Sequence, residues 1–174
     1  MPAPLIRSFD PIARRDAKVL ILGSMPGAAS LAAGCYYAHP QNAFWRILGE
    51  LLGFDAGAPY ATRTRNLRTA RVALWDVLQS CAREGSLDSA IERDSRVAND
   101  FRSFFQTHCQ ITHVFFNGTT AEECFRRHVL GTIDPGRFRC LRLPSTSPAH
   151  ASLSFAEKLR AWRAILVALG TPAK

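Results

Sequence analysis

Apolar residues gather in short runs separated by polar loops, and these runs predict the strands of a sheet. Residues 19–22 read Val-Leu-Ile-Leu, a pattern typical of a strand that is covered on both faces. Residues 111–116 and 138–143 have the β-branched, aromatic or alternating positions that strands favour. Residues 72–78 are apolar apart from Asp76, and this pattern fits either a strand or a buried helical turn.

Helical spacing of apolar positions predicts three helices. The first covers residues 42–52, the second covers residues 94–106, and the last begins at Phe155. In the second helix, one face carries Val97, Phe101, Phe104 and Phe105. In the last helix, the core face carries Leu159, Trp162, Ile165, Leu166 and Leu169.

Two stretches lack a clear period. Residues 1–17 are expected to form an N-terminal arm that packs on the domain. Residues 53–71 are interpreted as a connection in which arginine recurs every two or three positions, at Arg63, Arg65, Arg68 and Arg71. This spacing is equally typical of a segment that follows a phosphate backbone and of the solvated face of a helix.

Polar loops follow three of the predicted strands. They are residues 23–27, the pair Asn117-Gly118, and residues 144–150. The glycines of the first loop allow a sharp turn and a close approach to a ligand, whereas Asn-Gly is also ordinary turn chemistry. In a parallel sheet the loops at the carboxyl ends of the strands gather on one edge, where ligands bind. The three loops together therefore predict a site.

The segment 36–45 holds more aromatic and amide side chains than a connector needs. It contains Tyr36, Tyr37, His39, Gln41, Asn42, Phe44 and Trp45. Aromatic faces can stack on a base, and amides can read its hydrogen-bonding edge or hold a water molecule. The alternative is structural, with Trp45 on the buried side of a helix and Asn42 as its cap. The local pattern leaves both interpretations open.

Composition predicts one globular domain that spans residues 1–174 and carries a net charge of +8. Arginine supplies nearly all the cations, and its planar fork suits phosphate, so nucleic acid is a plausible partner. No apolar run reaches the roughly 20 residues that a bilayer requires. The start of the chain lacks the pattern of a secretory signal. We therefore expect no membrane association and a bacterial-type cytoplasmic protein that meets the nucleoid through DNA.

The five cysteines are scattered along the chain, and no C-x-x-C pair occurs. This spacing argues against a zinc ribbon and gives no local sign of an iron–sulfur cluster. We interpret the cysteines as buried, reduced thiols and expect no metal site.

Four stretches together resemble one protein family. They read L-G-S-M-P-G at 22–27, Y-Y-A-H-P-Q-N-A-F-W at 36–45, L-W-D-V-L at 74–78 with G-S-L-D at 85–88, and L-P-S-T-S-P-A at 143–149. The chain resembles the uracil-DNA glycosylase superfamily over residues 7–166, and its motifs are most similar to those of the hypoxanthine-DNA glycosylase branch, family 6. This resemblance implies a three-layer α/β/α fold around a central, mainly parallel four-stranded sheet.

The resemblance implies an enzyme that flips a deaminated base out of DNA and hydrolyses its bond to the sugar without a cofactor. We predict a monofunctional glycosylase, because a lyase route needs a lysine in the site and no lysine lies within the four motif stretches. In other branches the first motif carries an Asp or Asn that activates water, and here Ser24 holds that place. In this branch the role passes to the asparagine of the second motif, which is Asn42. His150 stands where the branch more often has asparagine.

The base-binding residues that the resemblance suggests are Phe44, Asn117, Tyr37, Gly23 and Ser24. Phe44 is expected to stack on the base, with Tyr36 or Tyr37 as alternatives. Asn117 is expected to read the Watson–Crick edge, because hypoxanthine and uracil both present a carbonyl beside an N–H. Phosphate contacts are expected from the last loop, through Pro144, Ser145, Thr146, Ser147 and His150. The expected partner is DNA that contains deaminated bases, and the protein is expected to be a monomer.

Three alternatives stay open at this point. Uracil could be the main substrate, or the fold could serve a nucleic-acid-binding protein without catalysis. A nucleotide-binding α/β enzyme is disfavoured, because the first loop has no G-x-G-x-x-G and no P-loop lysine. A lyase route needs a lysine in the site, and the three lysines, Lys18, Lys158 and Lys174, lie outside the motifs.

Overall fold

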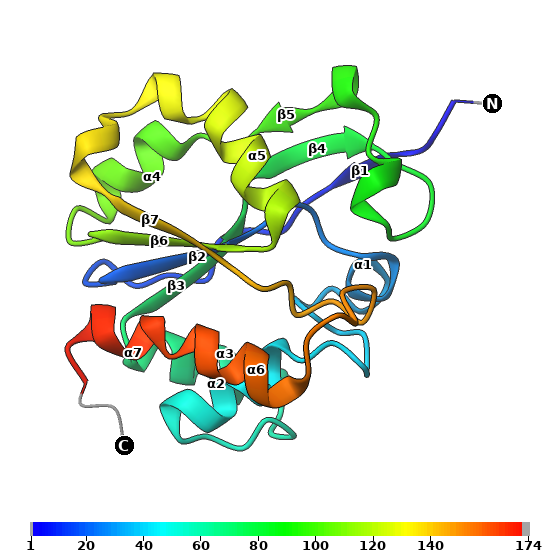
Figure 1. The fold of residues 1–174 in the computed structure, drawn as a ribbon. Helices are drawn as coiled ribbons and strands as arrows, with labels where there is room; N and C mark the ends of the chain where they lie inside the picture. Colours follow the sequence, from blue (N-terminus) through cyan, green and yellow to red (C-terminus); the bar gives the residue numbers. More distant parts are fainter. Residues whose placement is uncertain (1, 172–174) are drawn as a thin grey trace.

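A four-stranded parallel sheet forms the centre of the molecule in the computed structural model, which describes residues 2–171. Its strand order is β3 (Val72–Asp76), β2 (Val19–Gly23), β6 (His113–Asn117) and β7 (Arg139–Leu143). Every neighbouring pair is parallel, so all four carboxyl ends lie on one edge (Figure 1). The strands predicted at 19–22, 111–116 and 138–143 are confirmed, and residues 72–76 form a strand rather than a helical turn.

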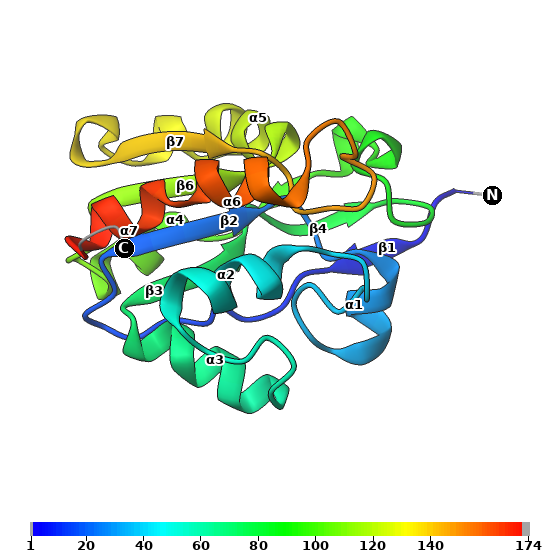
Figure 2. The same ribbon diagram turned by 60° about the horizontal axis from the view of Figure 1, so that its bottom comes forward.

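Helices cover both faces of this sheet (Figures 1 and 2). One face packs against α4 (Phe101–Thr107) and α5 (Thr119–His128), and the other packs against α2 (Phe44–Leu52), α3 (Tyr60–Thr69), α6 (Phe155–Trp162) and α7 (Ala164–Leu169). Strand residues alternate between the two cores, because successive side chains of a strand point to opposite faces. Leu20 and Leu22 join the first core, whereas Val19 and Ile21 join the second. The predicted three-layer α/β/α architecture is confirmed.

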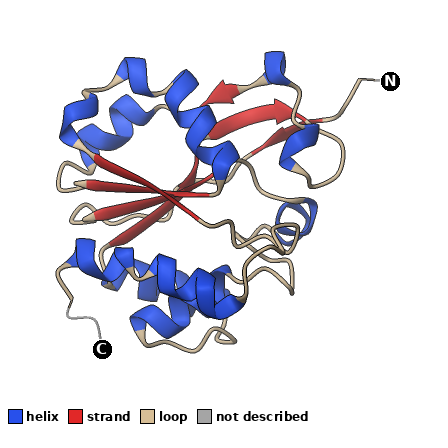
Figure 3. Ribbon diagram, viewed as in Figure 1, coloured by secondary structure: helices blue, strands red, loops and turns tan. Residues whose placement is uncertain are grey.

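A smaller antiparallel sheet extends the molecule beyond the carboxyl edge (Figure 3). It contains β1 (Leu5–Arg7), β4 (Leu78–Ala82) and β5 (Val97–Ala98), in the order β1-β4-β5. Only Val77 separates β3 from β4, so the chain passes directly from one sheet into the other. Pairing of β1 with β4 fixes the N-terminal arm onto the domain.

The second predicted helix begins later than its apolar spacing suggests. Instead of starting near residue 94, α4 starts at Phe101, and Val97 belongs to β5. The boundary is set by Asp100, whose side chain accepts a hydrogen bond of 3.0 Å from the N–H of Ser103. A capping carboxylate at this place satisfies a free N–H of the first turn, which defines the start of the helix.

The remaining elements are short. They are α1 (Ala28–Ala33) and the 3-10 turns η1 (Asp88–Ala90), η2 (Arg93–Ser95), η3 (Leu130–Thr132) and η4 (Pro135–Arg137). In residues 2–171 no helix is long and apolar enough to cross a membrane. The predicted domain limits at residues 1 and 174 fall outside the described part of the chain.

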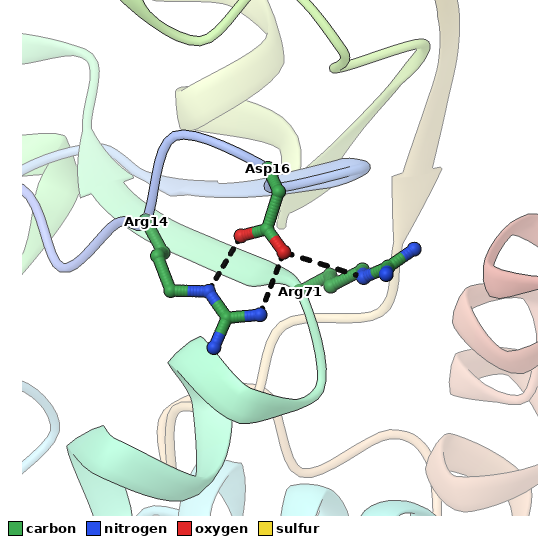
Figure 4. Close-up of polar contacts among 3 residues, drawn as sticks. All are labelled: Arg14, Asp16 and Arg71. Carbon is green, nitrogen blue, oxygen red and sulfur yellow. Dashed lines mark hydrogen bonds and ion pairs between the residues drawn. The ribbon is translucent and has the colours of Figure 1, made fainter.

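The arginine-rich stretch 53–71 contains α3, and several of its charges make contacts within the protein. Arg63 lies over the ring of Trp45, 4.7 Å from its centroid. Arg71 lies 3.4 Å from Asp16, which also binds Arg14 at 2.5 and 2.6 Å (Figure 4). Because Arg71 directly precedes β3, this cluster lies at the amino edge of the sheet, away from the strand-end loops.

Candidate active site

The loops at the carboxyl ends of the strands enclose a cavity of about 490 Å³. Its wall combines the loop after β2, the segment 36–42, the ends of β3 and β6, the turn at 86–88 and the loop 145–150. In Figure 1 this edge lies on the right, beside α1 and the orange loop that leads to α6. The expectation that the three polar loops gather on one edge is therefore confirmed.

Most of the predicted site residues line this cavity. They are Asn42, Tyr37, Asn117, Gly23, Ser24, Ser145, Thr146, Ser147 and His150. Two predicted residues lie elsewhere, namely Phe44 and Pro144. Phe44 is completely buried behind Tyr37, and the carbonyl of Pro144 accepts a hydrogen bond of 2.9 Å from the indole N–H of Trp162.

One row of residues crosses three neighbouring strands at the cavity. Gly23 of β2 pairs with Asp76 of β3, and Asn117 of β6 directly follows Phe116, the partner of Leu22. Residues in one row of a parallel sheet point to the same face. Asp76 and Asn117 therefore flank Gly23, which has no side chain to fill the space between them.

Gly23 leaves room for two polar groups. A Cβ atom at this position would lie 2.5 Å from Asp76 Oδ1 and 2.9 Å from the hydroxyl oxygen of Tyr37. Both distances are shorter than atomic contact allows, so any larger residue would displace one of these groups. The predicted role of Gly23 was close approach to a ligand, and the structure adds this steric reason.

Asp76 is a buried carboxyl group in the cavity wall, with only 3% of its surface exposed. Its Oδ2 atom has no hydrogen-bond partner within residues 2–171. Burial raises the pKa of Asp76 to about 8, the nearby Asp88 carboxylate adds to the rise, and Arg83 opposes it. Asp76 is not among the site residues predicted from the sequence, although it is the one charged residue in the apolar run 72–78.

Tyr37 presents its ring to the cavity and rests on Phe44. The two rings are stacked, with centroids 4.0 Å apart, and Tyr37 has a left-handed backbone with φ of +54°. Its hydroxyl is buried and forms no well-aligned hydrogen bond in the described residues. Burial raises the pKa of Tyr37, the charge of Asp76 adds to the rise, and the nearby Asn117 side chain opposes it as a hydrogen-bonding neighbour of the hydroxyl. The edges of Trp45 and Trp162 pack against Phe44, so Phe44 supports Tyr37 instead of facing the cavity.

The Asn117 side chain is fixed by Thr146. Asn117 Oδ1 accepts a hydrogen bond from the Thr146 N–H, and Asn117 Nδ2 donates one to Thr146 Oγ1, each of 2.9 Å. The main-chain N–H can only donate, so this pairing fixes which end of the amide is oxygen. One amide hydrogen and one lone pair of Oδ1 stay free of this pairing. Thr146 is 1% exposed, so its side chain supports Asn117 and faces away from solvent.

Asn42 is not the N-cap of α2, because Ala43 holds that position, but its side chain still contacts the first turn of the helix. Its Oδ1 atom accepts a hydrogen bond of 2.9 Å from the N–H of Phe44, the first residue of α2. This contact satisfies one free N–H at the start of the helix. The same side chain lines the cavity, and an amide oxygen has a second lone pair.

The first loop is held by an acid and a buried arginine. Ser24 Oγ donates a hydrogen bond of 2.7 Å to Asp88, whose pKa is raised by burial against the opposing effect of Ser24. Arg83 is 1% exposed and donates to the carbonyl oxygens of Pro26 and Gly85 at 2.5 and 3.0 Å. The sequence analysis assigned no role to Asp88 or Arg83, because both come from segments remote from the first loop.

The last loop is braced by short-range hydrogen bonds. Ser145 Oγ accepts from the Ser147 N–H, and Ser147 Oγ accepts from the Ala149 N–H, each at 3.2 Å. The carbonyl of His150 accepts a 2.7 Å hydrogen bond from the buried Lys158 Nζ. Across residues 2–171 no group of three or more His, Cys, Asp or Glu side chains is arranged to hold a metal ion.

Comparison with known proteins identifies the family. A sequence model of the uracil DNA glycosylase superfamily matches residues 10–166. Proteins named hypoxanthine DNA glycosylase from Methanosarcina barkeri and Methanosarcina acetivorans are 36% and 34% identical over 118 residues, which is 67% of this chain and 73% of each relative.

A solution NMR structure supports the same assignment. It is of a Methanosarcina acetivorans protein provisionally described as a uracil DNA glycosylase, with a TM-score of 0.80 and 30% identity over 96% of this chain and 99% of that one. The chain therefore belongs to the uracil DNA glycosylase superfamily and is a DNA glycosylase.

Proposed function

We propose that the protein flips a deaminated base, hypoxanthine above all, out of DNA into the cavity and hydrolyses its bond to the sugar, leaving an abasic site. The observation that carries this proposal is the meeting of Asn42, Asn117 and the two strand-end loops around one cavity. The volume of about 490 Å³ falls within the range of small-molecule sites. The names of the two Methanosarcina relatives favour hypoxanthine as the base.

The base stacks on Tyr37, with Phe44 as the support beneath it. Tyr37 replaces Phe44 in this role because it is the ring that faces the cavity. Asn117 donates its free amide hydrogen to the carbonyl oxygen that hypoxanthine and uracil share. The two bonds to Thr146 fix the amide in advance, which lowers the entropy cost of binding.

Asn42 holds the attacking water molecule by the free lone pair of its Oδ1 atom. An amide is a weak base, so this contribution is positioning rather than proton abstraction. The hydrogen bond from the Phe44 N–H supports the assignment, because it leaves the amide little freedom to turn away from the water. The barrier falls mainly through departure of the base, and donors that stabilise the negative charge on the leaving base assist that departure.

DNA phosphates bind the loop 144–150 through the half-buried hydroxyls of Ser145 and Ser147 and through main-chain groups, and they stabilise the positive charge that develops on the sugar. The reaction is hydrolytic, without a Schiff base. Lys158 is engaged with the carbonyl of His150 and does not line the cavity, which supports this choice. A DNA adduct trapped by borohydride would contradict it.

The test measures base release from matched duplexes that contain one deoxyinosine or one deoxyuridine, under single-turnover conditions. Wild type is expected to release hypoxanthine faster than uracil, and Asn42→Ala is expected to lose most of both activities. Faster release of uracil would make uracil the preferred base, and uracil is the base named in the description of the structural relative. DNA binding without release of either base would support a non-catalytic binding protein.

A further inference from the structure

One buried polar atom in the cavity wall lacks a partner, because Asp76 Oδ2 has no hydrogen-bond partner within residues 2–171. The other oxygen of the same carboxyl group, Oδ1, and the Tyr37 hydroxyl both lie within 3 Å of the point where a Gly23 Cβ atom would stand. An unpartnered buried polar group costs stability, so its presence at a cavity indicates that a ligand completes it.

The surroundings of the Asp76 carboxyl group favour its neutral form. Burial has the largest effect on its pKa, followed by the charge of Asp88, whereas Arg83 acts in the opposite direction. Burial raises the pKa of both Tyr36 and Tyr37, and the charge of Asp76 adds to the rise in each. His39 and His150 are the other titratable side chains at this cavity. A neutral carboxylic acid has an O–H to donate, which a carboxylate lacks.

We propose that Asp76, beside Gly23 in the cavity wall, donates a hydrogen bond through its carboxyl O–H to the carbonyl oxygen of the extruded base. This inference rests on the proposed glycosylase reaction and adds a second donor to that of Asn117. Asp76 and Asn117 stand on either side of Gly23 in one row of the sheet, so a base in the cavity meets a donor from each of the two flanking strands. A carboxylate at the same place would repel the carbonyl oxygen.

The donor acts as the bond between base and sugar breaks. The electron pair of that bond moves onto the base, and part of the negative charge appears on its carbonyl oxygen. The Asp76 O–H stabilises this charge while its proton stays on the carboxyl group. The water oxygen bonds to the sugar carbon and releases its proton to solvent, and the departing base takes one proton from solvent. The net reaction is therefore hydrolysis of the bond between base and sugar.

Asp76→Asn provides a discriminating variant, because the amide keeps a neutral donor and nearly the same shape but does not titrate. The measurement is the single-turnover rate of hypoxanthine release from pH 6 to 10. The single-turnover rate of wild type is expected to fall about tenfold per pH unit once Asp76 ionises above about pH 8. Asp76→Asn is expected to stay within about tenfold of wild type at pH 7 and to lose this alkaline decline. Asp76→Ala is expected to be about 100- to 1000-fold slower, as when one donor to a developing charge is removed.

Two further variants test whether the alkaline decline belongs to Asp76. Asp88→Asn removes a charge that raises the pKa of Asp76, so the decline should move to lower pH. Asp16→Asn lies at the opposite edge of the sheet and should leave both rate and decline as in wild type. An alkaline decline that persists in Asp76→Asn, or a wild-type rate in Asp76→Ala, would overturn the proposal.

A readout without catalysis separates this proposal from the glycosylase function. The side-chain carbon of Asp76, labelled with ¹³C, is followed by NMR as pH rises, and it should report a neutral carboxyl at pH 7. A carboxylate at pH 7 would overturn the inference even if base release is observed. Conversely, if wild type releases only uracil, the pH series is run on deoxyuridine, which has the same type of carbonyl group. Absence of release from both substrates would contradict the proposed function, and the donor role would be rejected with it.

Discussion

Asn117 and Thr146 lie 29 positions apart in the sequence and bind each other through two hydrogen bonds of 2.9 Å. One comes from the end of β6 and the other from the loop that follows β7, so the pair joins two of the three strand-end loops. Thr146 is almost completely buried, which protects both bonds from water. The contact therefore fixes an amide at the cavity before any ligand arrives.

Thr146→Val should weaken catalysis by freeing the Asn117 amide. Valine keeps the shape and the main-chain N–H but removes Oγ1, so Asn117 Nδ2 loses its partner. A buried group left unpaired costs about 1–3 kcal/mol, and we expect base release to slow by about tenfold or more. The control is Thr107→Val on α4, which makes the same change far from the cavity. A wild-type rate for Thr146→Val would show that the pair does not position Asn117.

The strands of the main sheet could be predicted from the sequence because they are buried on both faces. A strand that is buried on both faces has a continuous apolar run, such as residues 19–22, and this run is readily recognised in the sequence. Because the strands are parallel, the loops after them are expected on one edge of the sheet. Element boundaries that depend on one capping contact were less predictable. Asp100 moves the start of α4 to Phe101, although the apolar spacing extends back to Val97.

The cavity was only partly predictable, because its chemistry depends on contacts between distant segments. Asn42 and Asn117 were found, since motifs and strand ends marked them. Asp76 was not assigned, because its significance comes from burial beside Gly23, which only the register of β2 and β3 reveals. The sequence pattern places Phe44 in the cavity. In the structure, the left-handed backbone at Tyr37 positions the Tyr37 ring over Phe44 instead.

Replacement of Asn42 can separate its helix contact from its proposed catalytic role. Asn42→Ala removes the acceptor for the Phe44 N–H and should cost about 1 kcal/mol of stability, as other cap removals do. We expect base release to fall by about 100-fold, far more than this loss explains. Asp100→Ala is the matched control, because it removes a cap from α4 and should lower the melting temperature similarly with little change in rate. Equal rates in the two variants would reduce Asn42 to a structural role.

Gly23→Ala should disturb the cavity with a single methyl group. The added Cβ would lie 2.5 Å from Asp76 Oδ1 and 2.9 Å from the Tyr37 hydroxyl, so at least one group must shift. A displacement of about 1 Å at a reacting centre can cost about 100-fold in rate, and we expect a loss of this size. Gly131→Ala in η3 serves as the control, because no described atom lies within 4 Å of its added Cβ. Undiminished base release by Gly23→Ala would show that the space over Gly23 is not used.

Two tyrosines offer a comparison of paired and unpaired hydroxyls. Tyr37→Phe removes a buried hydroxyl that forms no well-aligned hydrogen bond in the described chain, so stability should be unchanged or higher. Base release should nevertheless slow by about tenfold if that hydroxyl contacts the base. Tyr60→Phe removes the acceptor for the Tyr36 N–H, at 3.0 Å, and should cost about 1 kcal/mol. Thermal melts and rates of both variants test the difference, and equal destabilisation would show that Tyr37 has a partner in solution.

Asp76→Asn should change how stability depends on pH. The pKa of Asp76 is raised from 3.8 to about 8 by burial, so the folded state holds a proton that the unfolded chain releases between these values. Stability of the wild type therefore decreases as pH rises through this window, by about 1.4 kcal/mol per pH unit from this group alone. Asparagine cannot ionise, so the free energy of unfolding of Asp76→Asn should rise relative to that of wild type between pH 5 and pH 8. Denaturant unfolding at both pH values measures this gain, and an equal difference at the two pH values would mean that Asp76 is already ionised in the folded protein.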